Sequence, residues 1–400
     1  MTFDSLIVAA KRQGASDLHL EAGLPAAVRV RGTLRTVGEP LAGKLLVELA
    51  HEVIGADAWR HFVARRSIDF SRTIGGVRCR INVMHTSKGI GFAVRLLASF
   101  QASIERLNLH PELKKLAAHT TGLILISGPT GSGKSSTLAA LIQEINLAEP
   151  RHILTIESPI EYVFRARRAF IRQREVGRDT PSFEQGLLDA LREDPDVLMV
   201  GEMREPETMR LTLNAAETGH LVLTTVHSGS CAEALQRVVL AFPSDIQDNI
   251  AAQLADCLVG VVCQRLRYRP DLSLRVPECE ILRPTNSVKT FIRSRDFFKL
   301  PQALETSAEH GMWTFARYQS WMAKRSQWHI PNVEDEAPDH EETALGEVPL
   351  PLPLSPKSGA TPVPDTTSPL VSPVEPKRPA APIEIEPVEG GLDELIKRLT

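Results

Sequence analysis

The apolar positions of the first hundred residues repeat with both helical and strand spacing. Thr2–Arg12 and Leu45–Ile54 place apolar side chains three and four residues apart, which predicts two amphipathic helices. The other apolar runs alternate or are continuous over strand lengths, and they are Gly14–Leu20, Ala27–Val30, Leu34–Val37, Ser67–Phe70, Val77–Met84 and Gly91–Leu97. This mixture predicts a compact α+β domain at residues 1–100, followed by an interdomain linker at residues 101–111.

From residue 112 onward, predicted strands and helices alternate along the chain. The strands are Gly122–Ser127, His152–Glu157, Val197–Val200 and His220–Val226, and the helices between them are Ser136–Ile145, Ser182–Leu191 and Glu205–Ala216. Repeating βα units predict a parallel sheet that binds ligands at the carboxyl ends of its strands. The pattern therefore predicts an α/β domain at residues 112–330, completed by helices at Ala232–Leu240, Ser244–Val262 and Gln302–Lys324.

The composition changes after Trp328. Residues 331–389 are rich in proline and acidic side chains and poor in aromatic ones, which predicts a disordered linker. Residues 390–400 end the chain with apolar side chains at helical spacing (Leu392, Leu395, Ile396 and Leu399), which predicts a short amphipathic helix. This helix either docks on a partner protein or another subunit, or is a frayed end, because the nine residues that follow Gly390 and Gly391 are too few for a stable isolated helix.

Charge is distributed unevenly between this tail and the body of the chain. Residues 331–391 carry twelve acidic and three basic side chains, so that residues 1–330 have a net charge of +6 although the whole chain has −3. Basic residues such as those of Arg165–Arg168 are interpreted as solvated or inter-subunit charges, and no direct nucleic-acid partner is expected.

The remaining composition favours a cytoplasmic protein. The five cysteines form no C-x-x-C pair, so neither a zinc site nor a redox motif is predicted. No apolar run approaches the ~20 residues of a membrane-spanning helix. The N-terminal sequence MTFDSLIVAAKR also lacks the pattern of a signal peptide.

One motif carries specific chemistry. Gly128–Ser135 reads GPTGSGKS and fits the phosphate-binding loop of nucleoside triphosphatases, G-x-x-x-x-G-K-[ST]. It lies between a predicted strand and a predicted helix, where backbone N–H groups can surround phosphate oxygens at the positive end of the helix. Lys134 supplies a positive charge for the β- and γ-phosphates, and Ser135 supplies a hydroxyl for Mg²⁺. The predicted nucleotide-binding residues are Gly128, Pro129, Thr130, Gly131, Ser132, Gly133, Lys134, Ser135 and Ser136.

Other polar residues also follow apolar strands directly. They are Glu157, Glu202 and His227. Because the carboxyl ends of parallel strands meet at one edge of the sheet, these side chains are expected to lie near the phosphate-binding loop.

Several long motifs, in this order, resemble those of the secretion-type ATPases of type IV pilus and type II secretion systems. They are QGASDLHLEAGLPAAVRVRG, GPTGSGKSSTLAALI, HILTIESPIEY, RQREVGRDT, LREDPDVLMVGEMR, AAETGHLVLTTVHS and HGMWTF. Within that family the chain is most similar to the pilus retraction ATPases. The resemblance covers residues 1–328 and leaves out the tail.

The resemblance implies a PAS-like N-terminal domain and a RecA-like ATPase domain that hydrolyses ATP with Mg²⁺. It also implies a homo-hexameric ring at the cytoplasmic face of the inner membrane, which acts on a pilus platform protein and is peripheral to the membrane through its partners.

Site roles follow from the same resemblance. Glu202 matches the acid at the end of the Walker B strand, beside Mg²⁺ and the attacking water, and Glu161 matches the glutamate that activates or orients this water. His220 and His227 match the histidine box that senses the nucleotide state. Arg80 and Arg95 match N-terminal-domain arginines that reach the phosphates; without the resemblance they would be ordinary surface charges on strands.

Two departures from the family pattern bear on function. Ser158 replaces the aspartate of the usual I-E-D-P-I-E, which leaves the rate of hydrolysis open. Ser287–Arg293 (SVKTFIR) keeps only part of a stretch that in the retraction group is linked to retraction, so the chain could be an accessory paralogue working with another retraction ATPase.

The alternatives to a retraction ATPase are a type II secretion or pilus-assembly ATPase and a weakly hydrolysing regulatory ring subunit. A four-cysteine zinc module and a longer N-terminal region, common in the secretion and assembly enzymes, are absent from this sequence.

Overall fold

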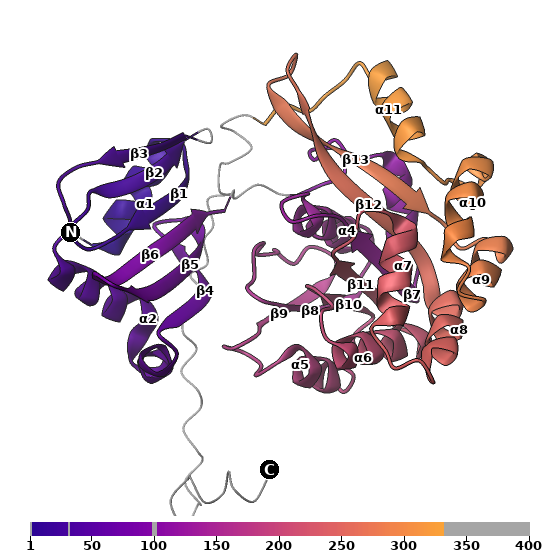
Figure 1. Cartoon of the computed structure of the whole chain (residues 1–400), viewed down its shortest axis with the longest axis horizontal. Coiled ribbons are helices and arrows are strands. Elements are labelled where there is room, and N and C mark those ends of the chain that lie inside the picture. Colours follow the sequence, from indigo (N-terminus) through magenta and orange to yellow (C-terminus); the bar gives the residue numbers. More distant parts are fainter. Residues whose placement is uncertain (1, 31–32, 98–101, 332–400) are drawn as a thin grey trace, which may run out of the picture. The chain divides into compact units, whose positions relative to one another are not determined.

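The computed structural model describes residues 2–30, 33–97 and 102–331 (Figure 1). The predicted linker at 331–389, except for its first residue, and the predicted helix at 390–400 lie outside the described residues. The boundary between two domains at residues 101–111 stays a prediction, as does the PAS-like character of the first domain. Within the described residues, the strands form a six-stranded and a seven-stranded sheet.

The first sheet is antiparallel and has the order β3-β2-β1-β6-β5-β4. Its strands are β1 (Ala15–Leu20), β2 (Ala26–Val30), β3 (Thr33–Val37), β4 (Ser67–Ile74), β5 (Val77–Thr86) and β6 (Gly89–Leu96). Helices α1 (Phe3–Arg12) and α2 (Gly43–Arg65) share a buried apolar core with it. The α+β composition predicted for this region is thus confirmed, although α2 continues beyond the predicted Ile54 with an interruption at Gly55.

The second sheet has the order β13-β12-β7-β11-β10-β8-β9 and is parallel except for the edge strand β13. Its strands are β7 (Gly122–Ser127), β8 (His152–Glu157), β9 (Phe170–Glu175), β10 (Val197–Val200), β11 (Leu221–Val226), β12 (Leu258–Arg269) and β13 (Leu274–Leu282). All side chains of β7, β10 and β11 are buried, as expected for central strands that are covered on both faces.

Helices cover both faces of this sheet (Figure 1). Alternate residues of β7 enter two separate cores: Leu123 and Leu125 join one, and Ile124 and Ile126 join the other. The first core includes α5 (Phe183–Ala190), α6 (Pro206–Glu217), α7 (Cys231–Leu240), α8 (Gln247–Cys257), α9 (Asn286–Arg293) and α10 (Leu300–Thr306). The second includes α3 (Lys114–Ala117), α4 (Lys134–Ala148) and α11 (Phe315–Lys324). The predicted α/β fold is therefore confirmed.

Two of the predicted helices are wrong in their extent. The segment predicted as one helix, Ser244–Val262, contains α8 and then the start of β12, because the apolar run from Leu258 pairs with β7. The segment Gln302–Lys324 contains two helices, α10 and α11, which are separated around Gly311 in the left-handed region at φ 75°. Strands β9 and β13 were not predicted.

No helix among residues 2–30, 33–97 and 102–331 combines the length and the apolar character needed to cross a membrane. All five cysteines are buried and unpaired.

Candidate nucleotide site

The phosphate-binding loop joins the carboxyl end of β7 to the start of α4. All three of its glycines have backbone conformations that side chains rarely adopt, Gly128 at φ 147°, Gly131 at φ 76° and Gly133 at φ 87°. A Cβ on Gly128 would run into the Gln264 carbonyl and lie 2.6 Å from the Ser132 hydroxyl. The loop can therefore follow this path only with glycine at these positions.

The polar groups of this loop fit an anionic ligand. The buried Ser132 hydroxyl has no hydrogen-bond partner among the described residues, although buried polar groups normally have one. Lys134 Nζ donates to the carbonyl oxygens of Gly128 and Pro129 at 3.0 and 3.1 Å, so its ammonium group lies over the loop. Because α4 begins at Lys134, the unpaired N–H groups of its first turn also point toward the loop.

Gln264 braces the loop from the neighbouring strand β12, and sequence reasoning missed it. Its side chain is buried, donates to the Ser132 carbonyl at 2.6 Å and accepts from the Thr137 hydroxyl at 2.6 Å. Gln264 follows the apolar run that ends at Cys263, whose register partner is Ser127 at the end of β7. The rule that identified Glu202 and His227, a polar residue directly after a buried run, would have found it.

The structure brings Glu202 and His227 to the same edge of the sheet as the phosphate-binding loop. Residues at the ends of β8, β10, β11 and β7 pair across the sheet in parallel, so the residues that follow them emerge together. Glu202 follows β10, and His227 follows β11. Glu161 lies on the loop after β8, and its charge acts on Lys134 together with that of Glu202.

The charges at this edge act on one another. Burial lowers the pKa of Lys134, and the negative charges of Glu202 and Glu161 oppose this effect. Burial and the nearby Lys134 charge lower the pKa of His227, against the attraction of Glu202. Glu202 also pairs with Arg204 at 2.9 Å. A positive group among acids at a helix N-terminus is an arrangement suited to binding phosphates and a metal ion together.

Arg80 and Arg95 are direct register partners on β5 and β6, so their side chains lie on the same face of the first sheet. Arg80 pairs with Asp69 at 2.6 Å, and Arg95 pairs with Asp17 at 3.0 Å. The hydrogen bond with Asp69 raises the pKa of Arg80, and the charges of Glu161 and Glu202 contribute in the same direction. Arg80 is therefore within electrostatic reach of both acids, while the contacts of Arg95 that we describe are with its own sheet.

His220 is not brought to this edge. It precedes β11, its Nδ1 lies 3.0 Å from the Ala215 carbonyl oxygen, and its own carbonyl accepts from Gly122 at the start of β7. The six-residue strand β11 separates it from His227. At about 3.3 Å per residue, the two histidines stand roughly 20 Å apart at opposite edges of the sheet. A sensing role for His220 stays a prediction, and within one chain it would act at a distance from the loop.

Glu157, the last residue of β8, is a buried acid beside this site. Burial raises its pKa to about 7, although its Oε1 accepts hydrogen bonds from Thr155 at 2.7 Å and Gln173 at 3.1 Å, and the charge of Glu161 raises the pKa further. The carboxyl group therefore holds a proton in the folded protein at pH values where an exposed glutamate has lost it.

This proton makes stability depend on pH. Between the ordinary glutamate pKa of 4.5 and about 7, the unfolded chain releases the proton and the folded chain keeps it, so stability falls as pH rises through that window. The full fall is about 3 kcal/mol by linkage. Glu157→Gln removes this dependence. We therefore expect the free energy of unfolding of the variant, relative to that of the wild type, to be about 1–3 kcal/mol higher at pH 8 than at pH 5. Urea unfolding of the nucleotide-free protein at both pH values measures the gain.

The exposed Glu48 on α2 provides the control. Glu48→Gln should change stability equally at pH 5 and pH 8. An equal effect of Glu157→Gln at the two pH values would mean that Glu157 is ionised throughout this range.

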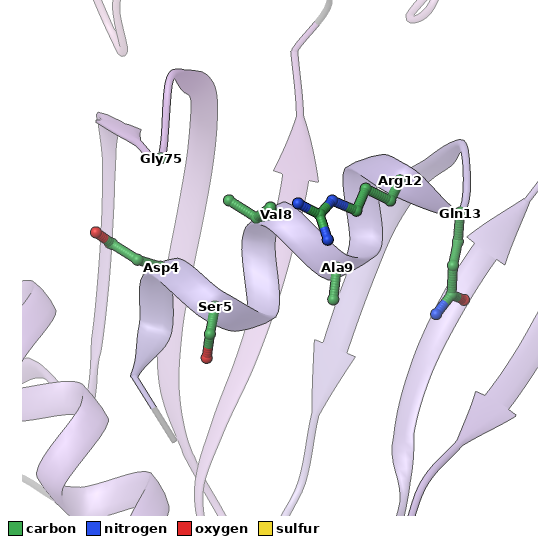
Figure 2. A pocket seen from close by; sticks show the side chains of 7 residues that line it. All are labelled: Asp4, Ser5, Val8, Ala9, Arg12, Gln13 and Gly75. Atoms are coloured by element: carbon green, nitrogen blue, oxygen red, sulfur yellow. The ribbon is translucent and has the colours of Figure 1, made fainter.

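A separate hollow lies along α1 (Figure 2). It is lined by Asp4, Ser5, Val8, Ala9, Arg12, Gln13 and Gly75. Figure 2 shows the Arg12 side chain reaching back along the helix toward Val8. The lining contains none of the predicted site residues, and we assign no nucleotide chemistry to it.

Comparison with known proteins agrees with this geometry. Residues 2–296 match the family model described as "Type II/IV secretion system protein". The chain is 39% identical over 316 residues to the type IV pilus retraction ATPase PilT of Pseudomonas aeruginosa, covering 78% of this chain and 92% of the relative. It is 35% identical over 317 residues to the type IV pilus ATPase PilU of the same organism, covering 79% and 83%.

A solved structure of the pilus retraction motor PilT with bound ADP superimposes with a TM-score of 0.71 and 36% sequence identity, covering 80% of this chain and 96% of that one. The chain therefore belongs to the type II/IV secretion system protein family, and within it is a homologue of the type IV pilus retraction ATPases.

Proposed function

We propose that this protein hydrolyses ATP to power the retraction of type IV pili, and hence twitching motility. The observation that carries the proposal is the meeting of Lys134, Glu202, Glu161 and His227 at the carboxyl edge of one parallel sheet, around a phosphate-binding loop. The same fold occurs in a relative described as a retraction motor, 96% of which the chain covers.

Each residue has a role in hydrolysis that its position allows. The amides of Gly128–Ser136 and the Lys134 ammonium bind the phosphates and stabilise charge that develops on the transferred group. Glu161 orients and deprotonates the attacking water, because its carboxylate can accept a proton. His227 lies near both Lys134 and Glu202 and responds to whether the phosphates are present.

Mg²⁺ fits the oxygen donors at this edge, namely the Ser135 hydroxyl and the Glu202 carboxylate. When bound, it would supply positive charge next to the β- and γ-phosphates.

The proposed assembly is a homo-hexameric ring, the form that a head-to-tail interface takes when its rotation closes. In the ring, Arg80 and Arg95 would exchange their Asp69 and Asp17 partners for phosphate oxygens. Domain movements in the ring would then act on the pilus platform protein at the cytoplasmic face of the inner membrane. Because SVKTFIR departs from the retraction-group pattern, the protein could act as an accessory to another retraction ATPase.

A purified-protein assay tests the proposal first. We expect phosphate release that requires Mg²⁺ and stops when the metal is chelated. Deletion of the gene should then leave cells hyperpiliated, because pili are built but not withdrawn; loss of pili would indicate an assembly or secretion ATPase instead.

Ser158 favours one competing function, a regulatory ring subunit with weak turnover. Its side chain is exposed next to Glu157, where the family usually places an aspartate. Absence of hydrolysis by the wild-type ring, both alone and mixed with a retraction ATPase, would favour that function.

A further inference from the structure

The loop that carries Glu161 is fixed by two side chains of the neighbouring strand β9. Gln173 donates to the Tyr162 carbonyl at 2.8 Å and accepts from the Phe164 amide at 2.9 Å. Glu175 accepts from the Ile160 amide at 3.1 Å. These bonds hold the backbone on both sides of Glu161.

The alternation of β9 explains why these two side chains act together. Gln173 and Glu175 are two residues apart, so they lie on one face of the strand. Arg172 and Arg174 lie on the other face, where both pair with Glu193 at 3.2 and 3.1 Å. The RQRE segment thus divides into an inner pair that contacts the Glu161 loop and an outer pair that contacts the end of α5.

The loop is also tied to the nucleotide-binding loop. The Tyr162 hydroxyl lies 2.7 Å from the hydroxyl of Ser136, which follows the predicted metal ligand Ser135. Gln173 reaches Glu157 at 3.1 Å as well, so a single amide connects the end of β8 with the loop that follows it.

Glu175 extends this network to the first sheet. Its carboxylate is 2% exposed and accepts from the Ser71 amide and hydroxyl at 3.3 and 2.7 Å. Arg78 lies 3.7 Å from the same carboxylate and donates to the Ile160 carbonyl at 3.0 Å. Ser71 belongs to β4 and Arg78 to β5. Both backbone polar groups of Ile160 are therefore held, one by Glu175 and one by Arg78.

A buried carboxylate in such a place is costly unless it is fully paired. Here the carboxylate is paired with the Ser71 amide and hydroxyl, the Ile160 amide and Arg78, so these contacts fix its place between β4, β5 and the Glu161 loop. We propose that Gln173 and Glu175 are positioning residues for Glu161, and that Glu175 makes this position depend on β4 and β5 through Ser71 and Arg78. The inference rests on the proposed role of Glu161 in hydrolysis.

Gln173→Ala in the full-length protein is the central test. It removes the bonds to Tyr162, Phe164 and Glu157 and changes no residue of the phosphate-binding loop. We expect kcat to fall by about 10- to 100-fold, as a misplacement of about 1 Å does, while KM for ATP stays unchanged. Arg172→Ala, on the opposite face of the same strand, is the matched control and should leave both constants unchanged.

Hydrogen exchange supplies a readout that does not need activity. The peptide of residues 158–164 should exchange faster in Gln173→Ala, with no change at residues 128–135. Ser71→Ala removes one donor to Glu175 while keeping the buried carboxylate paired with Arg78, and should give a smaller increase in the same peptide. Unchanged exchange at 158–164 in Gln173→Ala would overturn the proposal.

A double variant separates this inference from the proposed function. If Gln173 acts through Glu161, adding Gln173→Ala to Glu161→Gln should lower kcat no further. An equal additional loss in the double variant would show that Gln173 acts elsewhere. A wild-type protein without hydrolysis would refute the proposed function, whereas faster exchange at 158–164 would still establish that Gln173 holds the loop.

Discussion

Lys134→Ala is expected to lower ATP hydrolysis by about 100-fold or more, which is the loss measured when a preorganised donor to a developing negative charge is removed. Lys134 lies over the phosphate-binding loop, 3.0 and 3.1 Å from two of its carbonyl oxygens. Phosphates would replace those carbonyls as partners of its ammonium group. Alanine supplies neither charge nor donor, so both binding and turnover should suffer.

The fold should tolerate this change, because Lys134 is half-buried and its side chain donates to two carbonyl oxygens of the loop itself. Phosphate release at saturating Mg²⁺ measures turnover, and thermal unfolding without nucleotide checks the fold. Lys115→Ala is the control, since Lys115 is exposed and pairs with Glu112 within one helical turn. If the Lys134→Ala protein kept half of the wild-type activity, the prediction that this loop binds the nucleotide would be wrong.

Most of the candidate site at the carboxyl ends of the strands could be predicted because its signals are local. The strand, loop and helix around Gly128 are contiguous in sequence. The strands β8, β10 and β11 are short buried runs with a polar residue at the end or within two positions after it, namely Glu157, Glu202 and His227. Parallel pairing then brings those ends together without further information. The same rule separates His220 from His227. A six-residue strand lies between them, so the two histidines are at opposite ends of that strand.

What could not be predicted depends on partners distant in sequence. The run from Leu258 to Val262 is apolar at every position except Gly260, and such a run does not distinguish a buried strand from a buried helix. Its parallel pairing with β7, which lies far away in the sequence, makes it a strand. Strand β9 was not predicted because most of its side chains are charged or polar and form no alternating apolar pattern.

The same limit applies to the residues that hold the site together. Gln264 contacts Ser132 across 132 positions, and Glu175 contacts Ser71 across 104. Glu175 lies in the motif RQREVGRDT and Gln264 in none of the motifs, and only the folded structure shows which groups these two side chains contact. The sequence thus predicts the loop and the strand-end residues of the candidate site better than the side chains that support them.

Glu161→Gln is expected to lower kcat by about 100-fold or more while ATP still binds, because an amide matches the carboxylate in shape but is a far weaker proton acceptor. The Glu161 backbone should stay in place, since Gln173 and Glu175 bind the residues around it rather than its side chain. Steady-state kinetics should therefore show a loss in kcat with little change in KM.

Two further variants make this result specific to the attacking water. Glu217→Gln alters an acid that accepts from Gln253 at the end of α6, and should leave hydrolysis unchanged. Glu202→Gln removes a proposed metal ligand, so it should raise the Mg²⁺ concentration needed for half-maximal rate, a shift that Glu161→Gln should not produce. If Glu161→Gln instead kept its kcat, another acid at this edge, Glu202 or Glu157, would have to activate the water, and the pH dependence of the rate would identify Glu157. Because burial raises the pKa of Glu157 to about 7, hydrolysis would then increase as pH rises through 7.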